Sequence, residues 1–224
     1  MKINKGKQKN IVVLVSGNGS NLQAIIEYLK YNKEIGVVSA VISNKASAFA
    51  LERAKAHSID AIFVDPKDFN TREDYDLKLA TIAEIYNPTL IVLAGFMRIL
   101  SRQFVCQFKG RLINIHPSLL PKYTGLNTHT RAIENNDIKH GTSVHFVTEE
   151  LDGGPLIAQA ELNLIENESS RALADRVQSL EYKLYPWVIE LFLQGQIVQV
   201  SNGVKYKNKT LAHPLLLNLE SKNL

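Results

Sequence analysis

The chain has 224 residues and a formal net charge of +4, with 45% hydrophobic and 21% charged residues. This length allows one large domain or two small ones, and the composition is that of an ordinary globular protein. Its apolar runs stay below the roughly 18 residues of a membrane helix, and the run after the basic start is too short for a secretory signal. We therefore expect a cytoplasmic protein without membrane contact.

The excess positive charge comes from the first ten residues. Lys2, Lys5, Lys7 and Lys9 lie there without an acidic residue, and the remaining basic and acidic residues are equal in number. We expect a solvated basic tail over residues 1–10, and no basic, aromatic-interleaved stripe of the kind that binds nucleic acid follows it. The composition therefore argues against a nucleic-acid partner.

A single cysteine, Cys106, excludes an internal disulfide and a cysteine metal cluster. Cysteines of this kind are usually buried, so Cys106 is expected to pack as a small apolar side chain. No Cys/His spacing typical of a metal site is present, and no metal is expected.

A glycine-rich loop separates the first predicted strand, residues 11–15, from a predicted helix with apolar residues at helical spacing over 22–29. The loop, SGNGSN at 16–21, is neither a Walker A loop nor a GxGxxG fingerprint. Glycines let a ligand approach the backbone, and a helix N-terminus attracts anions, so the loop predicts a phosphate site. The alternative is a tight turn in which Ser20 or Asn21 caps the helix.

Strands and helices alternate through the first half of the chain, which predicts a parallel sheet with right-handed crossovers. Thr71 should open one of these helices, with Leu77, Ile82 and Ile85 on its core face and Pro88 after its end. The other expected strands are 36–43, 61–64, 90–94 and 111–115, and the other expected helix is 46–57.

The second half of the chain should add an antiparallel strand and a long helix to this sheet. Apolar residues recur along the helix that starts at Ser170, which Pro186 should kink or divide. The fold class predicted is α/β: a single Rossmann-like, mostly parallel twisted sheet flanked by helices. The remaining expected helices are 101–108 and 128–136, and the remaining expected strands are 141–147, 155–162, 197–200 and 204–206.

The strand at 111–115 runs into the octapeptide NIHPSLLP at 114–121. Pro117 drives His116 towards extended backbone, so Asn114 and His116 should lie on the same side of the strand end. An amide donor beside an imidazole suits the stabilisation of an oxyanion and the movement of a proton. The alternative is a turn at a strand end with a hydrogen-bonded histidine.

Ligands of parallel sheets bind beyond the carboxyl ends of the strands. Three loops should share that edge: residues 16–21, residues 95–100, and the loop around His116. In the second of them Met97, Ile99 and Leu100 either pack in the core or line a flat ligand. Arg98, and Arg72 on the preceding helix, either meet an anionic group or face water.

Four motifs now stand in a fixed order: SGNGSN at 16–21, AGFMRIL at 94–100, NIHPSLLPKYTG at 114–125 and HGTSVHFVTEELDGGP at 140–155. Together, over residues 11 to 200, they resemble the phosphoribosylglycinamide formyltransferases, folate-dependent enzymes of purine biosynthesis. The resemblance implies transfer of the formyl group of 10-formyltetrahydrofolate to the amino group of glycinamide ribonucleotide. It also implies small-molecule partners only, and a monomer or homodimer in the cytoplasm.

The resemblance implies a catalytic trio of Asn114, His116 and Asp152. The amide and an imidazolium would stabilise the oxyanion, and the carboxylate would orient the ring and relay a proton through water. The other histidines, His129, His140 and His145, are expected either to be structural or to contact the catalytic residues without touching substrate. The implied glycinamide ribonucleotide site is Gly19, Ser20, Asn21 and Glu181. The implied folate site is Arg72, Met97, Arg98, Ile99, Leu100, Asn114, Thr148, Glu149, Glu150, Leu151 and Asp152.

The expected organisation follows from this resemblance. Residues 11–100 form the half that binds the nucleotide phosphate and 101–200 the folate and catalytic half, between the basic tail of 1–10 and a C-terminal extension of 201–224. Thr124 and Asn127, in the loop after the lysine and tyrosine at 122–123, depart from the pattern expected of the family, which affects fine substrate contacts.

Three competing interpretations remain. A methionyl-tRNA formyltransferase shares the motif at 114–121 but carries a C-terminal RNA-binding domain, for which too few residues follow position 200. A formyltetrahydrofolate hydrolase normally carries an N-terminal regulatory domain, for which too few residues precede the first strand. A non-catalytic nucleotide- or folate-binding module would keep SGNGSN but has no need of Asn114, His116 and Asp152 together.

Overall fold

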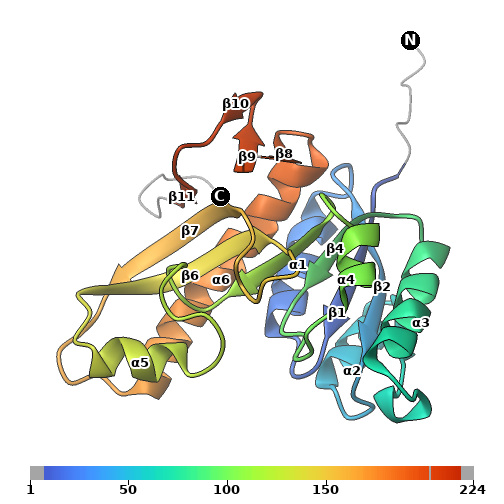
Figure 1. The fold of residues 1–224 in the computed structure, drawn as a ribbon, viewed down its shortest axis with the longest axis horizontal. Coiled ribbons are helices and arrows are strands. Elements are labelled where there is room, and N and C mark those ends of the chain that lie inside the picture. Colours follow the sequence, from blue (N-terminus) through green and yellow to red (C-terminus); the bar gives the residue numbers. More distant parts are fainter. Residues whose placement is uncertain (1–7, 202, 218–224) are drawn as a thin grey trace. The chain divides into compact units, whose positions relative to one another are not determined.

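A computed structural model describes residues 8–201 and 203–217. Lys2, Lys5 and Lys7 of the expected basic tail, and residues 218–224 of the expected C-terminal extension, lie outside the described residues. The chain forms two compact units, Met1–Leu112 and Ile113–Leu224, which we call the first and the second unit (Figure 1).

The first unit contains parallel strands in the order β4-β1-β2-β3. Residues Ile11 to Val15 of β1 are 0% exposed. A strand covered on both faces has no need of polar alternation, which explains the continuous apolar run in the sequence. The bounds are β1 (Asn10–Val15), β2 (Val37–Ser43), β3 (Asp60–Phe63) and β4 (Pro88–Leu93).

Helices flank these strands: α1 and α2 contact each other and β2, and α3 contacts α4. Helix α1 buries the predicted stripe of Leu22, Ile25, Ile26 and Leu29. The bounds are α1 (Ser20–Tyr31), α2 (Phe49–Ala56), α3 (Arg72–Ile85) and α4 (Arg102–Gln107), with a short 3₁₀ helix at Pro66–Asp68.

Two helix starts differ from the expected ones. Neither Ser20 nor Asn21 caps α1, because both lie inside the helix and the N-cap is Gly19, which has no side chain to cap with. Helix α2 begins at Phe49, later than expected, because the residues before it form a turn in which the N–H of Ala48 donates to the carbonyl of Lys45.

The core face of α3 was predicted wrongly, although its cap was predicted correctly. The Thr71 hydroxyl accepts from the N–H of Asp74, but Leu77 and Ile85 are 50% and 69% exposed. The helix carries two apolar stripes, and the stripe with the aromatic ring of Tyr75 is the buried one. The buried residues are Tyr75, Asp76, Leu79, Ala80 and Ala83.

Cys106 is exposed, so its expected core packing is also wrong. Helix α4 is short and turns Phe104 and Val105 inwards. The rings of Phe104 and Phe108 pack 4.7 Å apart and occupy the apolar face, which leaves Cys106 on the outer side.

In the second unit β6 is antiparallel to both β5 and β7, and β11 is parallel to β7. A separate three-stranded antiparallel sheet has the order β10-β9-β8. The bounds are β5 (Leu112–His116), β6 (Lys139–Phe146), β7 (Leu156–Asn163), β8 (Ile197–Val200), β9 (Gly203–Tyr206), β10 (Lys209–Thr210) and β11 (Leu215–Leu216).

Helix α6 (Ser170–Leu193) packs on β6 and β7, and α5 (Thr128–Glu134) packs on α6 (Figure 1). Pro186 was expected to kink or divide α6, but the helix runs undivided through it for 24 residues. Pro186 and its neighbour Tyr185 are both buried. Packing of this apolar face outweighs the one backbone hydrogen bond that a proline removes.

The expected fold class is confirmed: a Rossmann-like α/β fold with a mixed, mostly parallel sheet, flanking helices, an antiparallel strand and a long C-terminal helix. In the small antiparallel sheet, β8 and β9 correspond to the strands expected at 197–200 and 204–206, and β10 was not predicted. Strand β11, which pairs with β7, was not predicted either. In the part of the chain that the structure describes, no helix is both long and apolar enough to cross a membrane.

Candidate active site

Strands β5 and β6 and the loop after β6 bring the expected catalytic residues together in the second unit. Nδ1 of His116 lies 3.4 Å from Oδ2 of Asp152. Oδ1 of Asp152 lies 3.8 Å from Nε2 of His145, and this nitrogen is 3.3 Å from Nδ2 of Asn114. Four polar side chains therefore form one connected cluster, in which His145 contacts the catalytic residues, one of the two roles expected for it.

The local sequence explains this arrangement. Residues two apart in a strand share a face, and the antiparallel register places Asn114 opposite His145. Asp152 follows in a tight turn with a left-handed backbone, φ 52°. Gly154 lets this turn lie against β6, because a Cβ at its position would come within 1.8 Å of the Phe146 carbonyl oxygen. Asp152 is followed by two glycines, residue types typical of turns, and this turn places the carboxylate beside His116.

Both ring nitrogens of His116 face hydrogen-bond acceptors. Nε2 lies 2.8 Å from the backbone oxygen of Tyr123, and a carbonyl only accepts, so this nitrogen carries a proton. Nδ1 faces the carboxylate of Asp152, which also accepts from the N–H of Gly125 at 2.9 Å. A proton on each ring nitrogen would therefore face an acceptor, so the geometry suits an imidazolium at this position. Donation from Nε2 to a reacting oxygen requires the contact with Tyr123 to open or to be shared.

His145 is a neutral ring with its proton on Nδ1. Its Nδ1 lies 2.9 Å from the Phe146 carbonyl oxygen and donates to it. Burial lowers the pKa of His145, against the opposing effects of this backbone bond and of Asp152. The neutral ring then presents a lone pair at Nε2, which accepts from the amide of Asn114. This contact fixes which end of the amide points at the ring.

The loop over His116 is tied down along its length. The Ser118 hydroxyl donates to the Lys122 carbonyl at 2.6 Å, and the Tyr123 hydroxyl donates to Asp137 at 2.8 Å. Arg131 donates to the carbonyl of Thr124 at 2.7 Å and stacks on the Tyr123 ring. Thr124, one of the two departures from the family pattern, therefore contributes its backbone here.

His129 and His140 form a separate pair beneath this loop. Nδ1 of His129 lies 3.1 Å from Nε2 of His140, and the ring of His140 packs 6.3 Å from that of Tyr123. Burial lowers the pKa of both histidines, and that of His140 falls to about 4. At neutral pH the pair is uncharged and shares one hydrogen bond, which suits a structural role.

The glycine-rich loop lies in the first unit, between β1 and α1. The carbonyl of Gly17 accepts from the N–H of Ala50 at 3.1 Å, and the carbonyl of Gly19 accepts from the N–H of Gln23 at 2.9 Å. Gly19 has φ 74°, and a Cβ there would lie 2.6 Å from the Cβ of Ala50. Glycine is therefore required at position 19 for both backbone conformation and space.

The loops after β1 and β4 are hydrogen-bonded to each other, as expected of loops at one edge of a parallel sheet. The N–H of Ser16 donates to the Gly95 carbonyl at 3.1 Å, and the N–H of Met97 donates to the Ser16 hydroxyl at 2.8 Å. Met97 and Ile99 are 65% and 56% exposed, which leaves apolar side chains accessible on this edge. The third expected loop, around His116, belongs to the second unit.

Two other residues of the loop after β4, Arg98 and Leu100, have side chains that pack into the first unit. Leu100 is buried, and the guanidinium of Arg98 stacks 4.6 Å above the ring of Tyr75. The loop is anchored by the buried carboxylate of Asp76, which accepts from the N–H of Ser101. Burial raises the pKa of Asp76, against the effect of its bonds to Ser101.

The remaining expected ligand-binding residues are spread over both units. Arg72 is the exposed first residue of α3 and pairs with Glu73 at 3.1 Å. Glu181 is buried in α6. The exposed turn before Asp152 contains Glu149, Glu150 and Leu151, and Thr148 precedes them, half-buried.

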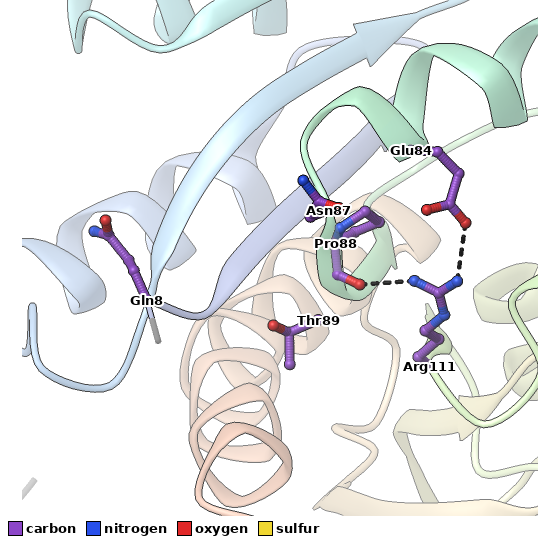
Figure 2. A pocket seen from close by; sticks show the side chains of 6 residues that line it. All are labelled: Gln8, Glu84, Asn87, Pro88, Thr89 and Arg111. Carbon is purple, nitrogen blue, oxygen red and sulfur yellow. Dashed lines mark hydrogen bonds and ion pairs between the residues drawn. The ribbon is translucent and has the colours of Figure 1, made fainter. Parts of the chain in front are cut away.

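A pocket of about 340 Å³ lies elsewhere in the first unit, at the amino end of β4 (Figure 2). Arg111 lines this pocket, and its guanidinium donates to the Pro88 carbonyl at 2.8 Å and to Glu84 at 2.9 Å. The pocket is thus at the opposite strand end from the glycine-rich loop. Within the described residues, no group of three or more His, Cys, Asp or Glu side chains is arranged to hold a metal ion.

Comparison with known proteins supports the expected chemistry. A family model described as formyl transferase matches residues 9–189. The chain is 54% identical to the phosphoribosylglycinamide formyltransferase of Escherichia coli, over 87% of this chain and 92% of that protein. It is 43% identical to the enzyme of that name from Haemophilus influenzae, over 91% and 96%.

Solved structures agree. The phosphoribosylglycinamide formyltransferase of Coxiella burnetii superposes with a TM-score of 0.89 and 45% identity, covering 95% of this chain and 100% of that one. Glycinamide ribonucleotide transformylase 1 of Symbiobacterium toebii gives a TM-score of 0.87 at 38% identity, covering 90% and 95%.

Proposed function

Because the chain belongs to the formyl transferase family, among its phosphoribosylglycinamide formyltransferases, we propose a catalytic role for the cluster around His116. The chain is a formyl-transferring enzyme of purine biosynthesis. It transfers the formyl group of 10-formyltetrahydrofolate to the amino group of glycinamide ribonucleotide and releases tetrahydrofolate.

The contact between His116 and Asp152 carries this proposal. Formyl transfer to an amine passes through a tetrahedral oxyanion, which hydrogen-bond donors stabilise. Asn114 donates to this oxygen through its amide, and His116 stabilises the charge as an imidazolium. Asp152, 3.4 Å from the ring, orients it and relays the proton of the attacking amine through water.

The other expected residues act by binding. The N–H groups of the glycine-rich loop and of the start of α1 hold the nucleotide phosphate, at Gly19, Ser20 and Asn21. Glu181 contacts the ribose. The exposed apolar side chains of Met97 and Ile99 lie against the folate ring, and Arg72 meets its anionic tail. The backbone of Arg98 and Leu100, whose side chains face inwards, and the turn from Thr148 to Leu151 complete the folate site.

We propose the partners and the organisation of the chain on the same basis. Residues 11–100 serve the nucleotide phosphate, 101–200 serve folate and catalysis, and the enzyme works as a monomer or homodimer in the cytoplasm. Its ligands are small molecules rather than nucleic acid.

An acceptor comparison tests this function. Purified protein receives the formyl donor with glycinamide ribonucleotide, with water alone, or with charged initiator tRNA, and release of deformylated folate is followed. Turnover with glycinamide ribonucleotide alone is the expected result. Equal turnover with water alone would identify a hydrolase, turnover with the tRNA would identify a tRNA formyltransferase, and donor binding without turnover would identify a binding module.

A further inference from the structure

Helix α2 lies behind the glycine-rich loop and holds two of its consecutive carbonyl groups. The N–H of Ala50 donates to the carbonyl of Gly17 at 3.1 Å. Nε of Arg53 donates to the carbonyl of Asn18 at 2.8 Å, and Nη2 donates to the Asn18 side-chain oxygen at 3.2 Å. Both carbonyls of the loop's centre are therefore directed towards the same helix.

These two contacts also set the direction of the loop's donors. A trans peptide is planar, with its C=O and N–H on opposite sides. When the carbonyls of Gly17 and Asn18 point at α2, the N–H groups of Asn18 and Gly19 point away from it. Successive N–H groups on one side of a loop, next to a residue with positive φ, form a concave site for anions.

Arg53 connects this loop to the start of α1. Its Nη1 donates to the Gln23 side-chain oxygen at 3.2 Å, and the backbone N–H of Gln23 makes the first helical bond, to the carbonyl of Gly19. The guanidinium packs 4.9 Å from the ring of Phe49, which restricts the orientation of its planar set of N–H donors. One planar side chain thus contacts the loop, the helix that follows it and α2 at once.

We propose that Arg53 is a positioning residue for the nucleotide phosphate. It holds the Asn18–Gly19 peptide in the orientation that presents its N–H to the phosphate, and its charge stabilises the anion from behind the loop. This inference rests on the proposed function, which places the phosphate of glycinamide ribonucleotide at this loop. It assigns a role to a residue outside the expected binding sets.

The test compares substrates with and without the phosphate. We would measure kcat and KM for glycinamide ribonucleotide and for its dephosphorylated nucleoside in the wild type, Arg53→Gln, Arg53→Lys and Lys55→Gln. Lys55→Gln is the charge-matched control, because Lys55 sits on the same helix, is 60% exposed and pairs with Glu52 instead of the loop. Thermal unfolding of each variant reports on the fold.

Arg53→Gln should raise KM for the nucleotide about tenfold, the scale of hydrogen bonds lost from a charged group, with kcat within about twofold. The kcat/KM for the nucleoside should stay within about twofold, and the folate KM should not change. Arg53→Lys should recover only part of this loss, because an ammonium keeps the charge but cannot make the same set of hydrogen bonds as the planar guanidinium. Lys55→Gln should match the wild type.

Three results would overturn the inference. These are an equal loss of kcat/KM for nucleotide and nucleoside in Arg53→Gln, full recovery in Arg53→Lys, or an effect of Lys55→Gln as large as that of Arg53→Gln. Failure of the wild type to use glycinamide ribonucleotide would instead overturn the proposed function, so the two failures are distinguishable.

Discussion

Asn114 and His145 face each other across β5 and β6, with Nδ2 of the amide 3.3 Å from Nε2 of the ring. The ring accepts here because its Nδ1 proton is donated to the Phe146 carbonyl at 2.9 Å. An amide NH₂ group has two hydrogens, so one binds the ring and the other remains for a reacting oxygen. His145 thereby determines which end of Asn114 is available to substrate.

The first prediction follows from this pair. His145→Leu removes the acceptor and lets the amide turn, so kcat should fall roughly tenfold or more, the scale of a displaced oxyanion donor. The KM for the formyl donor should change little. Steady-state kinetics measure both, and the comparison variant is His145→Gln, whose side-chain oxygen can still accept and which should retain more activity. Equal activity of the leucine variant and the wild type would contradict this role.

The second prediction concerns pH and stability. Burial, and then the neighbouring His129, lower the pKa of His140 from its ordinary value of 6.5 to about 4, against the opposing effects of Asp137 and Glu168. Between these two pH values the unfolded chain binds more protons than the folded one, so the free energy of unfolding must fall as the pH is lowered. The expected loss is on the order of 3 kcal/mol, from about 1.4 kcal/mol per pKa unit.

Urea unfolding at several pH values between 7 and 4 measures this loss. His140→Gln should flatten the decline, since glutamine does not titrate in this range, and His213→Gln, at an exposed histidine, is the matched control. A decline of the same steepness in His140→Gln and the wild type would show that other groups cause it.

The third prediction concerns the cap of α3. The Thr71 hydroxyl accepts from the N–H of Asp74 at 3.1 Å and donates to the Asp74 carboxylate at 2.7 Å. Thr71→Ala should lower the free energy of unfolding by about 1 kcal/mol, whereas Thr71→Ser, which keeps the hydroxyl, should cost much less. Thermal unfolding compares the two, and indistinguishable midpoints would mean that the cap contributes nothing.

Patterns confined to one element were predicted well from the sequence. The apolar run of β1, the stripe of α1 and the Thr71 cap each depend on residues within a few positions of one another. The face of α3 was predicted wrongly because the sequence offers two stripes, and the buried one is identified by contacts from the loop after β4, where Arg98 stacks on Tyr75 and the N–H of Ser101 donates to Asp76. Tertiary packing therefore determines which face of α3 is buried.

The candidate site shows the same limit. Alternation along β5 predicted that Asn114 and His116 lie on one face, whereas Asp152 entered the site only through the resemblance to the family. The sequence left two roles open for His145, because its pairing with Asn114 depends on the register between β5 and β6, which no local pattern specifies. The hydrogen bonds from Arg53 to the glycine-rich loop were not predicted either, because no local pattern links two residues that are 35 positions apart in the sequence.

His116 and Asp152 should act as one unit in catalysis, and a double-mutant cycle tests this directly. His116→Ala and Asp152→Asn are measured singly and together in single-turnover formyl transfer to glycinamide ribonucleotide. Asparagine tolerates the left-handed backbone at position 152, φ 52°, so the fold should be kept.

Each single change should lower the rate roughly 10²-fold or more, the scale of general acid–base catalysis. If Asp152 acts through the ring of His116, the double variant should fall within about threefold of the slower single variant. Losses that multiply to roughly 10⁴-fold would show two independent contributions, and near-wild-type turnover in folded Asp152→Asn would contradict the assigned roles outright.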